Sequence, residues 1–419
     1  MSSLAQTKAR LILLNFLQFF VWGAWLISIG GYLGGTLKFS GVQIGSIFST
    51  LGIASLFMPA LIGYAADRWV NAERLLGLCH LTSAGLLFYA STVTDPTLFF
   101  WVMLLNSMFY MPTIALNNSV SYHILVKNGF DVVKDFPPIR VWGTIGFIAA
   151  MWIVDLAGWK SSNMQLIFSA SFAIVLALYA FTMPACKPGL SKKKNGILST
   201  LGLDAFVLFK QPKMMVFFFF AMFLGAALQI TNAFGGSYLD SFNVTHPDSF
   251  GVQHPILLLS VSQISETLFI LTIPFFLHKF GIKKVMIISM FAWVLRFGLF
   301  AIGDPGSGLP LLLLSMVVYG MAFDFFNISG SLFVEKEAPQ GMRAGAQGLF
   351  MIMTNGIGAT FGGYCSGLVV DFFTKTNPAT NELISRDWTS IWFAFAGYAL
   401  LLAVVFPFAF KYEHNTKAE

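Results

Sequence analysis

The sequence contains little charge and little cysteine. Only 11% of its 419 residues are charged and 56% are hydrophobic, whereas an ordinary soluble domain is about 25% charged. Because a single water-soluble core would not absorb so much apolar surface, these proportions exclude a soluble enzyme. The three cysteines, Cys79, Cys186 and Cys365, have neither the clustering of metal ligands nor the even number of a disulfide framework, so we expect none of them to carry chemistry.

Several functional motifs are also missing. The six histidines show no metal-ligand spacing, so we expect neither a metal site nor another cofactor. The chain has no G-x-x-x-x-G-K-[ST] loop to hold ATP phosphates, which argues against an ATP-driven pump. No cleavage site stands out after the first apolar stretch, so we expect the first helix to be retained.

What the sequence does contain is a series of long apolar runs. At about 35 residues for a membrane helix and its connection, the length accommodates about twelve helices. The runs lie near residues 11–33, 44–66, 75–93, 97–121, 139–159, 164–184, 214–234, 255–277, 285–303, 309–333, 344–370 and 388–410. They predict an all-α polytopic membrane protein with an N-terminal six-helix bundle (1–186), a basic cytoplasmic linker (187–213) and a C-terminal six-helix bundle (214–419).

The positions of the basic residues predict the orientation. Lys and Arg accumulate in the short cytoplasmic loops of membrane proteins. With the N-terminus inside, most of the 25 Lys and Arg fall in inner loops, and only Lys38, Lys160, Lys375 and Arg386 fall in outer ones. Both termini are therefore predicted to be cytoplasmic. Because topology explains where the bases lie, the net charge of +6 gives no reason to expect a nucleic-acid partner.

Few ionisable side chains lie within the predicted spans. Each costs about 2.5 to 3.5 kcal/mol at a helix centre, so each calls for a partner or a function. Glu266 and Asp324 lie near the middle of their helices and are expected to line a cavity. Arg140, at the start of its helix, suits a cavity, an interfacial charge or an inner-gate ion pair. Arg296 is expected to snorkel or to form a structural pair.

Polar and aromatic residues repeat at helical spacing beside these charges. Residues three, four or seven apart share one helix face, and four predicted helices carry such sets: Arg140, Thr144 and Phe147; Gln229 and Asn232; Gln263 and Glu266; Tyr319 and Phe323. One such pair would be explained by bonding between helices, but four sets favour a polar site. Amides, a carboxylate and aromatic faces suit a nucleoside, and a sugar would use nearly the same groups. The absence of a basic cluster argues against phosphorylated substrates.

Longer motifs resemble a known family. The runs NFLQFFVWGAW (15–25), DFPPIRVWGTIGF (135–147), GLDAF (202–206), LQITN (228–232), SQISE (262–266) and FDFFNISG (323–330) closely resemble the nucleoside:proton symporter family of the major facilitator superfamily. The segment from Gly63 to Arg74 is similar to a superfamily signature in which Asp67, Arg68 and Arg74 form an inner-face latch. The resemblance covers nearly the whole chain. It implies the major facilitator fold, in which two six-helix bundles rock about a central site, and location in the bacterial inner membrane.

The resemblance also implies residue roles. The family's nucleoside contacts fall on the four sets above, and its helix 10 acid falls on Asp324. We therefore expect monomeric, lipid-embedded, proton-coupled nucleoside import by alternating access, with purine and pyrimidine nucleosides as substrates. Asp324 is the first candidate for the proton carrier and Glu266 the second. If Arg140 lies close to Asp324, its charge would favour the ionised acid.

Several alternatives stay open from the residues alone. The preference between a broad range of nucleosides and xanthosine is undecided. A symporter for sugars or other small neutral polar solutes is the rival within transport, and a non-transporting receptor is a further one. An intramembrane enzyme would need a nucleophile with a base, or clustered metal ligands, and the chain offers no such set.

Overall fold

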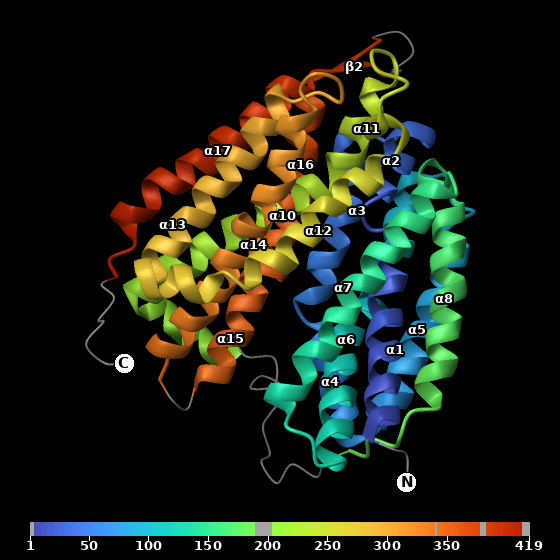
Figure 1. The fold of residues 1–419 in the computed structure, drawn as a ribbon, viewed down its shortest axis with the longest axis vertical. Coiled ribbons are helices and arrows are strands. Elements are labelled where there is room, and N and C mark those ends of the chain that lie inside the picture. Colours follow the sequence, from blue (N-terminus) through green and yellow to red (C-terminus); the bar gives the residue numbers. More distant parts are fainter. Residues whose placement is uncertain (1–3, 189–202, 340–341, 378–382, 413–419) are drawn as a thin grey trace. The chain divides into compact units, whose positions relative to one another are not determined.

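The computed structural model describes residues 4–188, 203–339, 342–377 and 383–412 (Figure 1). Much of the predicted basic linker, including Lys192, Lys193 and Lys194, lies outside the described residues. The chain divides into two compact units. The N-terminal unit comprises Met1–Leu37 and Ile53–Leu201, and the C-terminal unit comprises Lys38–Gly52 and Gly202–Glu419.

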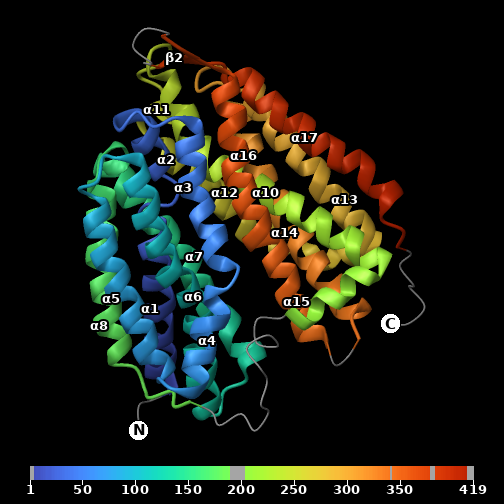
Figure 2. The same ribbon diagram turned by 180° about the vertical axis from the view of Figure 1, so that it is seen from behind.

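The N-terminal unit is a bundle of long helices that run side by side in both views (Figures 1 and 2). Helix α1 packs against α7 and α8, and α5 packs against α6 and α8. Its elements are α1 (Leu4–Gly23), α2 (Ile29–Gly31), the π-helix η1 (Tyr32–Thr36), α4 (Met58–Arg68), α5 (Ala72–Ala90), α6 (Pro96–Lys127), α7 (Val132–Leu156), η2 (Trp159–Ser161) and α8 (Met164–Phe181). Helix α3 (Gly41–Ser55) lies mostly in the C-terminal unit.

The C-terminal unit is also built from long helices. Helix α14 packs against α12 and α13, α13 packs against α17, and α10 packs against α16. Its elements are η3 (Leu203–Lys210), α10 (Pro212–Asp240), η4 (Ser241–Asn243), α11 (Phe250–Gln253), α12 (Pro255–Ile270), α13 (Ile273–Ile302), α14 (Leu309–Glu337), α15 (Arg343–Met351), the π-helix η6 (Ile352–Gly358), α16 (Ala359–Phe372), β1 (Thr374–Thr376), β2 (Leu383–Arg386) and α17 (Trp388–Ala409). Strands β1 and β2 pair antiparallel, with Thr374 opposite Arg386.

The predicted α-class membrane fold is confirmed, with one short pair of strands beside the helices. Among the described residues, eight helices are long and apolar enough to cross a membrane. Each of the twelve predicted spans overlaps helical residues, although some of these helices are short or interrupted. The predicted span 255–277 is one example. Helix α12 ends at Ile270, and α13 begins at Ile273 with Pro274 in its first turn, where a missing N–H is tolerated.

Glycines allow a turn and a close approach in the C-terminal unit. Gly281 has φ 73° and ψ 167° inside α13, a backbone conformation that a side chain rarely adopts, so the chain turns there. Between α3 and α16, a Cβ at Gly45 would lie 2.1 Å from the carbonyl oxygen of Gly363. Small residues let membrane helices come this close. The Asp371 carboxylate of α16 also accepts hydrogen bonds from the N–H groups of Gly41 (2.6 Å) and Val42 (2.8 Å).

Candidate substrate site

Seven of the predicted site residues lie on three helices of the C-terminal unit. Helix α12 packs against both α10 and α14. Gln229 and Asn232 come from α10, Gln263 and Glu266 from α12, and Tyr319, Phe323 and Asp324 from α14. The structure therefore places these polar faces on neighbouring helices of one unit.

Three of these side chains carry a buried polar atom without a hydrogen bond to the described residues. The atoms are Oε1 of Gln229, Oε1 of Gln263 and Oδ2 of Asp324. Gln229 is 7% exposed and Asp324 is 5% exposed. An unsatisfied buried polar group costs about 1 to 3 kcal/mol, and folded proteins contain few of them. Their gathering on three adjacent helices suits a site that binds a polar ligand.

Two aromatic residues of the predicted site lie on α14, the helix that also carries Asp324. The rings of Tyr319 and Phe323 are parallel, with centroids 5.8 Å apart and an interplanar angle of 2°. Trp293 of α13 meets Tyr319 edge-on, with a centroid distance of 6.0 Å. Because rings prefer offset-stacked or edge-to-face contacts, a planar base fits such an aromatic group.

Both candidate proton carriers belong to the same group. Glu266 and Asp324 interact electrostatically with each other, and each interacts with Tyr319. Two neighbouring carboxyls at membrane depth give a proton two places to bind. Their positions alone therefore do not decide which acid carries the proton.

The N-terminal unit contributes the fourth predicted set, from α7. The Arg140 guanidinium lies 3.9 Å from the centre of the Phe19 ring of α1, close enough for a cation–π contact. Phe147 is 9% exposed and meets Trp22 of α1 edge-on at 6.1 Å. Gly146 allows α7 and α1 to approach closely, because a Cβ at this position would lie 2.3 Å from a backbone oxygen of α1 and would clash with it. Arg140, Thr144 and Phe147 thus lie along one helix that is firmly packed against α1.

A buried polar network in this unit was missed by the sequence analysis. Gln18 of α1 donates to the Thr113 hydroxyl (2.7 Å) and bonds to Nε2 of His80 (2.8 Å), and the Tyr110 hydroxyl donates to the Gln18 carbonyl (2.9 Å). Gln18, His80 and Thr113 are 0% exposed. The three- and four-residue spacing of polar residues in α6 was the available signal.

This network connects to the predicted site through one ring. Trp22 contacts Tyr110 at a centroid distance of 5.7 Å and Phe147 at 6.1 Å. The network holds Tyr110 of α6 against α1. Tyr110 in turn supports the Trp22 ring, and Trp22 supports Phe147.

A polar stripe on α6 was also missed. It borders a cavity of about 900 Å³. The lining residues are Ala115, Asn118, Ser119, Tyr122, His123, Val126 and Lys127. Polar side chains are costly against lipid, so this face of α6 is suited to border water.

The predicted inner-face latch lies near the junction of α4 and α5. Asp67 and Arg68 are exposed in the last turn of α4, and Arg74 is exposed near the start of α5. The Arg68 guanidinium lies 4.3 Å from the centre of the Tyr64 ring. The buried acid at this junction is Glu73, which accepts hydrogen bonds from the Asn71 amide (3.0 Å) and the backbone N–H of Cys186 (2.8 Å). The latch itself stays a prediction.

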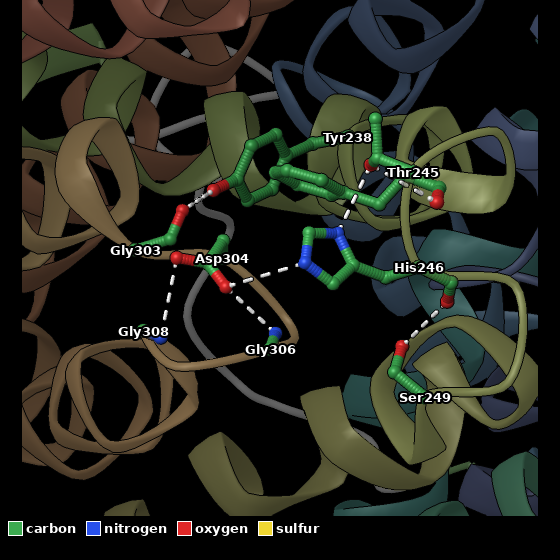
Figure 3. Close-up of polar contacts among 9 residues, drawn as sticks. Tyr238, Thr245, His246, Ser249, Gly303, Asp304, Gly306 and Gly308 are labelled. Carbon is green, nitrogen blue, oxygen red and sulfur yellow. Dashed lines mark hydrogen bonds and ion pairs between the residues drawn. The ribbon is translucent and has the colours of Figure 1, made fainter.

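A second polar group ties two loops of the C-terminal unit together (Figure 3). The Tyr238 hydroxyl donates to the carbonyls of Phe300 (2.7 Å) and Gly303 (2.8 Å). The Asp304 carboxylate accepts from two backbone N–H groups of its own loop and lies 4.0 Å from Nε2 of His246. These contacts join the end of α10 and the loop after it to the end of α13 and the loop that follows.

Known proteins match this chain over nearly its whole length. The profile of the family described as Nucleoside H+ symporter matches residues 5–415. The xanthosine permease of Escherichia coli is 55% identical, and the match covers 97% of this chain and 96% of that protein. The nucleoside permease NupG of E. coli is 52% identical over the same shares of the two chains.

Solved structures agree with these relatives. A crystal structure of the nucleoside transporter NupG superposes with a TM-score of 0.91 at 51% identity, covering 97% of this chain and 100% of that chain. A bacterial homologue of the lysosomal transporter Spinster, 13% identical over 98% and 97% of the two chains, has a TM-score of 0.70 and shares the fold alone. The predicted major facilitator fold is confirmed. The chain belongs to the nucleoside H+ symporter family, which consists of membrane transporters rather than enzymes.

Proposed function

We propose that this chain imports nucleosides across a bacterial inner membrane, as a monomer with both termini in the cytoplasm. The proton gradient supplies the energy and no cofactor takes part. Family membership supports nucleoside and proton as the transported species. The observation that carries the proposal is the set of unpartnered buried atoms on Gln229, Gln263 and Asp324, three residues of one unit.

In this proposal the uncharged polar residues and the aromatics hold the nucleoside. An amide offers both a donor and an acceptor, so Gln229, Asn232 and Gln263 bond to the base edge or the ribose. The parallel rings of Tyr319 and Phe323 stack on the base. Glu266 accepts from the ribose hydroxyls, and Arg140, Thr144 and Phe147 complete the site.

Asp324 carries the proton in this proposal, and Glu266 is the alternative carrier. Asp324 is almost fully buried, and one of its oxygens makes no hydrogen bond to the described residues. A proton on that oxygen therefore removes a costly buried charge from an apolar site. In this proposal the acid binds its proton more tightly in one access state than in the other, so protonation shifts the populations of the two states. We further propose that the rocking bundles are 1–186 and 214–419, joined by the linker 187–213, with Asp67, Arg68 and Arg74 as the inner latch.

The substrate range concerns which nucleosides this chain prefers. One relative is named for xanthosine and another for nucleosides in general. We propose purine and pyrimidine nucleosides, with xanthosine among them. Uptake of labelled uridine in the presence of unlabelled xanthosine, adenosine or ribose measures the preference directly. Competition by ribose alone would favour the sugar symporter instead.

The test of coupling uses proteoliposomes with and without an imposed pH gradient. Labelled uridine should accumulate only with the gradient. Asp324→Asn should retain exchange of internal for external uridine but lose uphill accumulation. The matched control is Asp248→Asn, in an exposed loop, which should accumulate normally. Equal accumulation with and without the gradient would refute proton coupling, and normal accumulation by Asp324→Asn would move the proton to another acid.

A further inference from the structure

Arg296 of α13 is a buried cation that the proposed mechanism does not use. It is 3% exposed, so the sequence-based expectation of snorkelling is wrong. One terminal nitrogen of its guanidinium donates to the Ser315 carbonyl (3.1 Å) and to the Ser262 hydroxyl (3.3 Å). The Ser315 hydroxyl donates back to the Arg296 carbonyl (2.8 Å). The side chain therefore joins three helices, α12, α13 and α14.

The guanidinium also stacks on a residue of the candidate site. It lies 4.4 Å from the centre of the Tyr319 ring and 5.4 Å from that of Phe300. Both distances are within the range of cation–π contacts, which strengthen when desolvated. Ser262 directly precedes Gln263, and Ser315 lies one turn before Tyr319. Arg296 thus contacts or adjoins two residues proposed to bind the nucleoside.

The electrostatic partner of Arg296 is a tyrosine, Tyr319. Within the described part of the chain no carboxylate forms an ion pair with it, and its Nε has no hydrogen-bond partner. Tyr319 links Arg296 to the acids of the site, because it interacts electrostatically with Arg296, with Glu266 and with Asp324. Helix α17, which also packs on α13, carries no acid or base. Its titratable group, Tyr398, donates to the Phe223 carbonyl.

We propose that Arg296 is a positioning residue for both substrate and proton in this transporter. Its stacking holds the Tyr319 ring in position for the nucleoside. Its hydrogen bond to Ser262 holds the part of α12 that carries Gln263. Its fixed positive charge also favours the ionised form of the acids that interact with Tyr319, so the proton leaves them readily on the inner side. Arg296 keeps its own proton throughout, and the transported proton passes from outer water to a carboxylate and then to inner water. The inference rests on the proposed coupling through Asp324 or Glu266.

Two variants test the electrostatic role and the positioning role of Arg296 separately. Arg296→Gln removes the charge, so the acids stay protonated to higher pH. The midpoint of the alkaline decline of uridine uptake should rise by about one pH unit, the low end of the effect of a nearby charge. Arg296→Lys keeps the charge but loses the planar stacking and the fork of donors. It should leave that midpoint unchanged and raise the KM for uridine by about three- to tenfold.

The matched control is Ser289→Ala, which removes a buried hydrogen bond from α13 to the Ala322 carbonyl of α14 (2.6 Å) without changing charge. It should change neither the pH midpoint nor KM, even if the protein melts earlier. A wild-type midpoint in Arg296→Gln overturns the electrostatic role. A wild-type KM in Arg296→Lys overturns the positioning role, and this variant still decides the question if Arg296→Gln does not fold. If the wild-type protein does not accumulate uridine under a pH gradient, the proposed function is refuted instead.

Discussion

Replacing Gln229 by Met separates binding from folding at the candidate site. Met has nearly the shape of Gln but no amide. In the ligand-free protein, Oε1 of Gln229 is buried and makes no hydrogen bond to the described residues. Removing that atom therefore takes away an unsatisfied group instead of a structural contact. The substitution should leave the unfolding free energy unchanged or raise it slightly, while nucleoside binding weakens.

The size of both effects follows from hydrogen-bond energetics. A net hydrogen bond contributes about 0.5 to 1.5 kcal/mol, and about 1.4 kcal/mol is a factor of ten in Kd. Loss of one such bond to the nucleoside should thus weaken binding by about 2- to 12-fold, and loss of two bonds by up to about 140-fold. Gln165 is the matched control, because it is fully buried. It accepts from the Ser28 hydroxyl (2.7 Å) and donates to the carbonyls of Lys160 (3.1 Å) and Ser162 (2.9 Å). Gln165→Met should cost about 3 kcal/mol of stability.

The assay combines thermal unfolding in detergent, with and without uridine, and equilibrium binding of labelled uridine. Gln229→Met should melt at or above the wild-type temperature and show a smaller stabilisation by uridine. Gln165→Met should melt well below the wild type and bind uridine with wild-type affinity. If Gln229→Met melts as low as Gln165→Met while its affinity is unchanged, then Gln229 has a structural role and the reasoning about unpartnered atoms is wrong.

Two further predictions concern carboxylates at helix ends. Asp371→Ala should lower the unfolding free energy by about 1 to 2 kcal/mol, because it removes the acceptor of two N–H groups at the start of α3. Thermal unfolding measures this loss, with the exposed-loop variant Asp248→Ala as the control. Equal melting temperatures of the two variants would contradict the prediction. At the start of α17, hydrogen bonds from the Ser390 hydroxyl and N–H lower the pKa of Asp387. Its contribution to stability is present above the unfolded pKa, near about 3.9, and is lost as the pH falls through the folded pKa. At about pH 6, Asp387→Ala should therefore melt below the wild type, by the equivalent of about 1 kcal/mol. The difference in melting temperature should narrow below about pH 4. A difference that does not depend on pH would exclude a stabilising role of the ionised Asp387.

The faces of the helices were predictable because they depend on local spacing. Gln229 and Asn232, or Tyr319 and Phe323, share a face as soon as their segment is helical. The hydrophobic runs made the helices themselves predictable, since about 20 apolar residues suffice to cross a bilayer. Interruptions such as the one between α12 and α13 were not predicted, because a sum of hydropathy over a window does not register a break next to Pro274.

The environment of single polar residues was not predictable. His80 and Arg296 both stand out in a sequence as ionisable groups in apolar runs, yet only the structure shows that Gln18 bonds to the first and that Ser262, Ser315 and Tyr319 surround the second. Their partners come from other helices, between 19 and 62 residues away for the hydrogen bonds. Sequence spacing within one helix carries no information about such neighbours.

Hydropathy and helical period are local properties, so the amino-acid sequence was enough to predict a helical membrane protein with polar faces on four helices. Its motifs pointed to the family. The folded chain was needed to show that residues 38–52 pack with the C-terminal unit and that Arg296 is buried against Tyr319. It was also needed to show that polar atoms of Gln229, Gln263 and Asp324 lack hydrogen-bond partners among the described residues. Whether a buried polar group is satisfied depends on which helices meet and at what distance, and that follows from the packing of the whole unit.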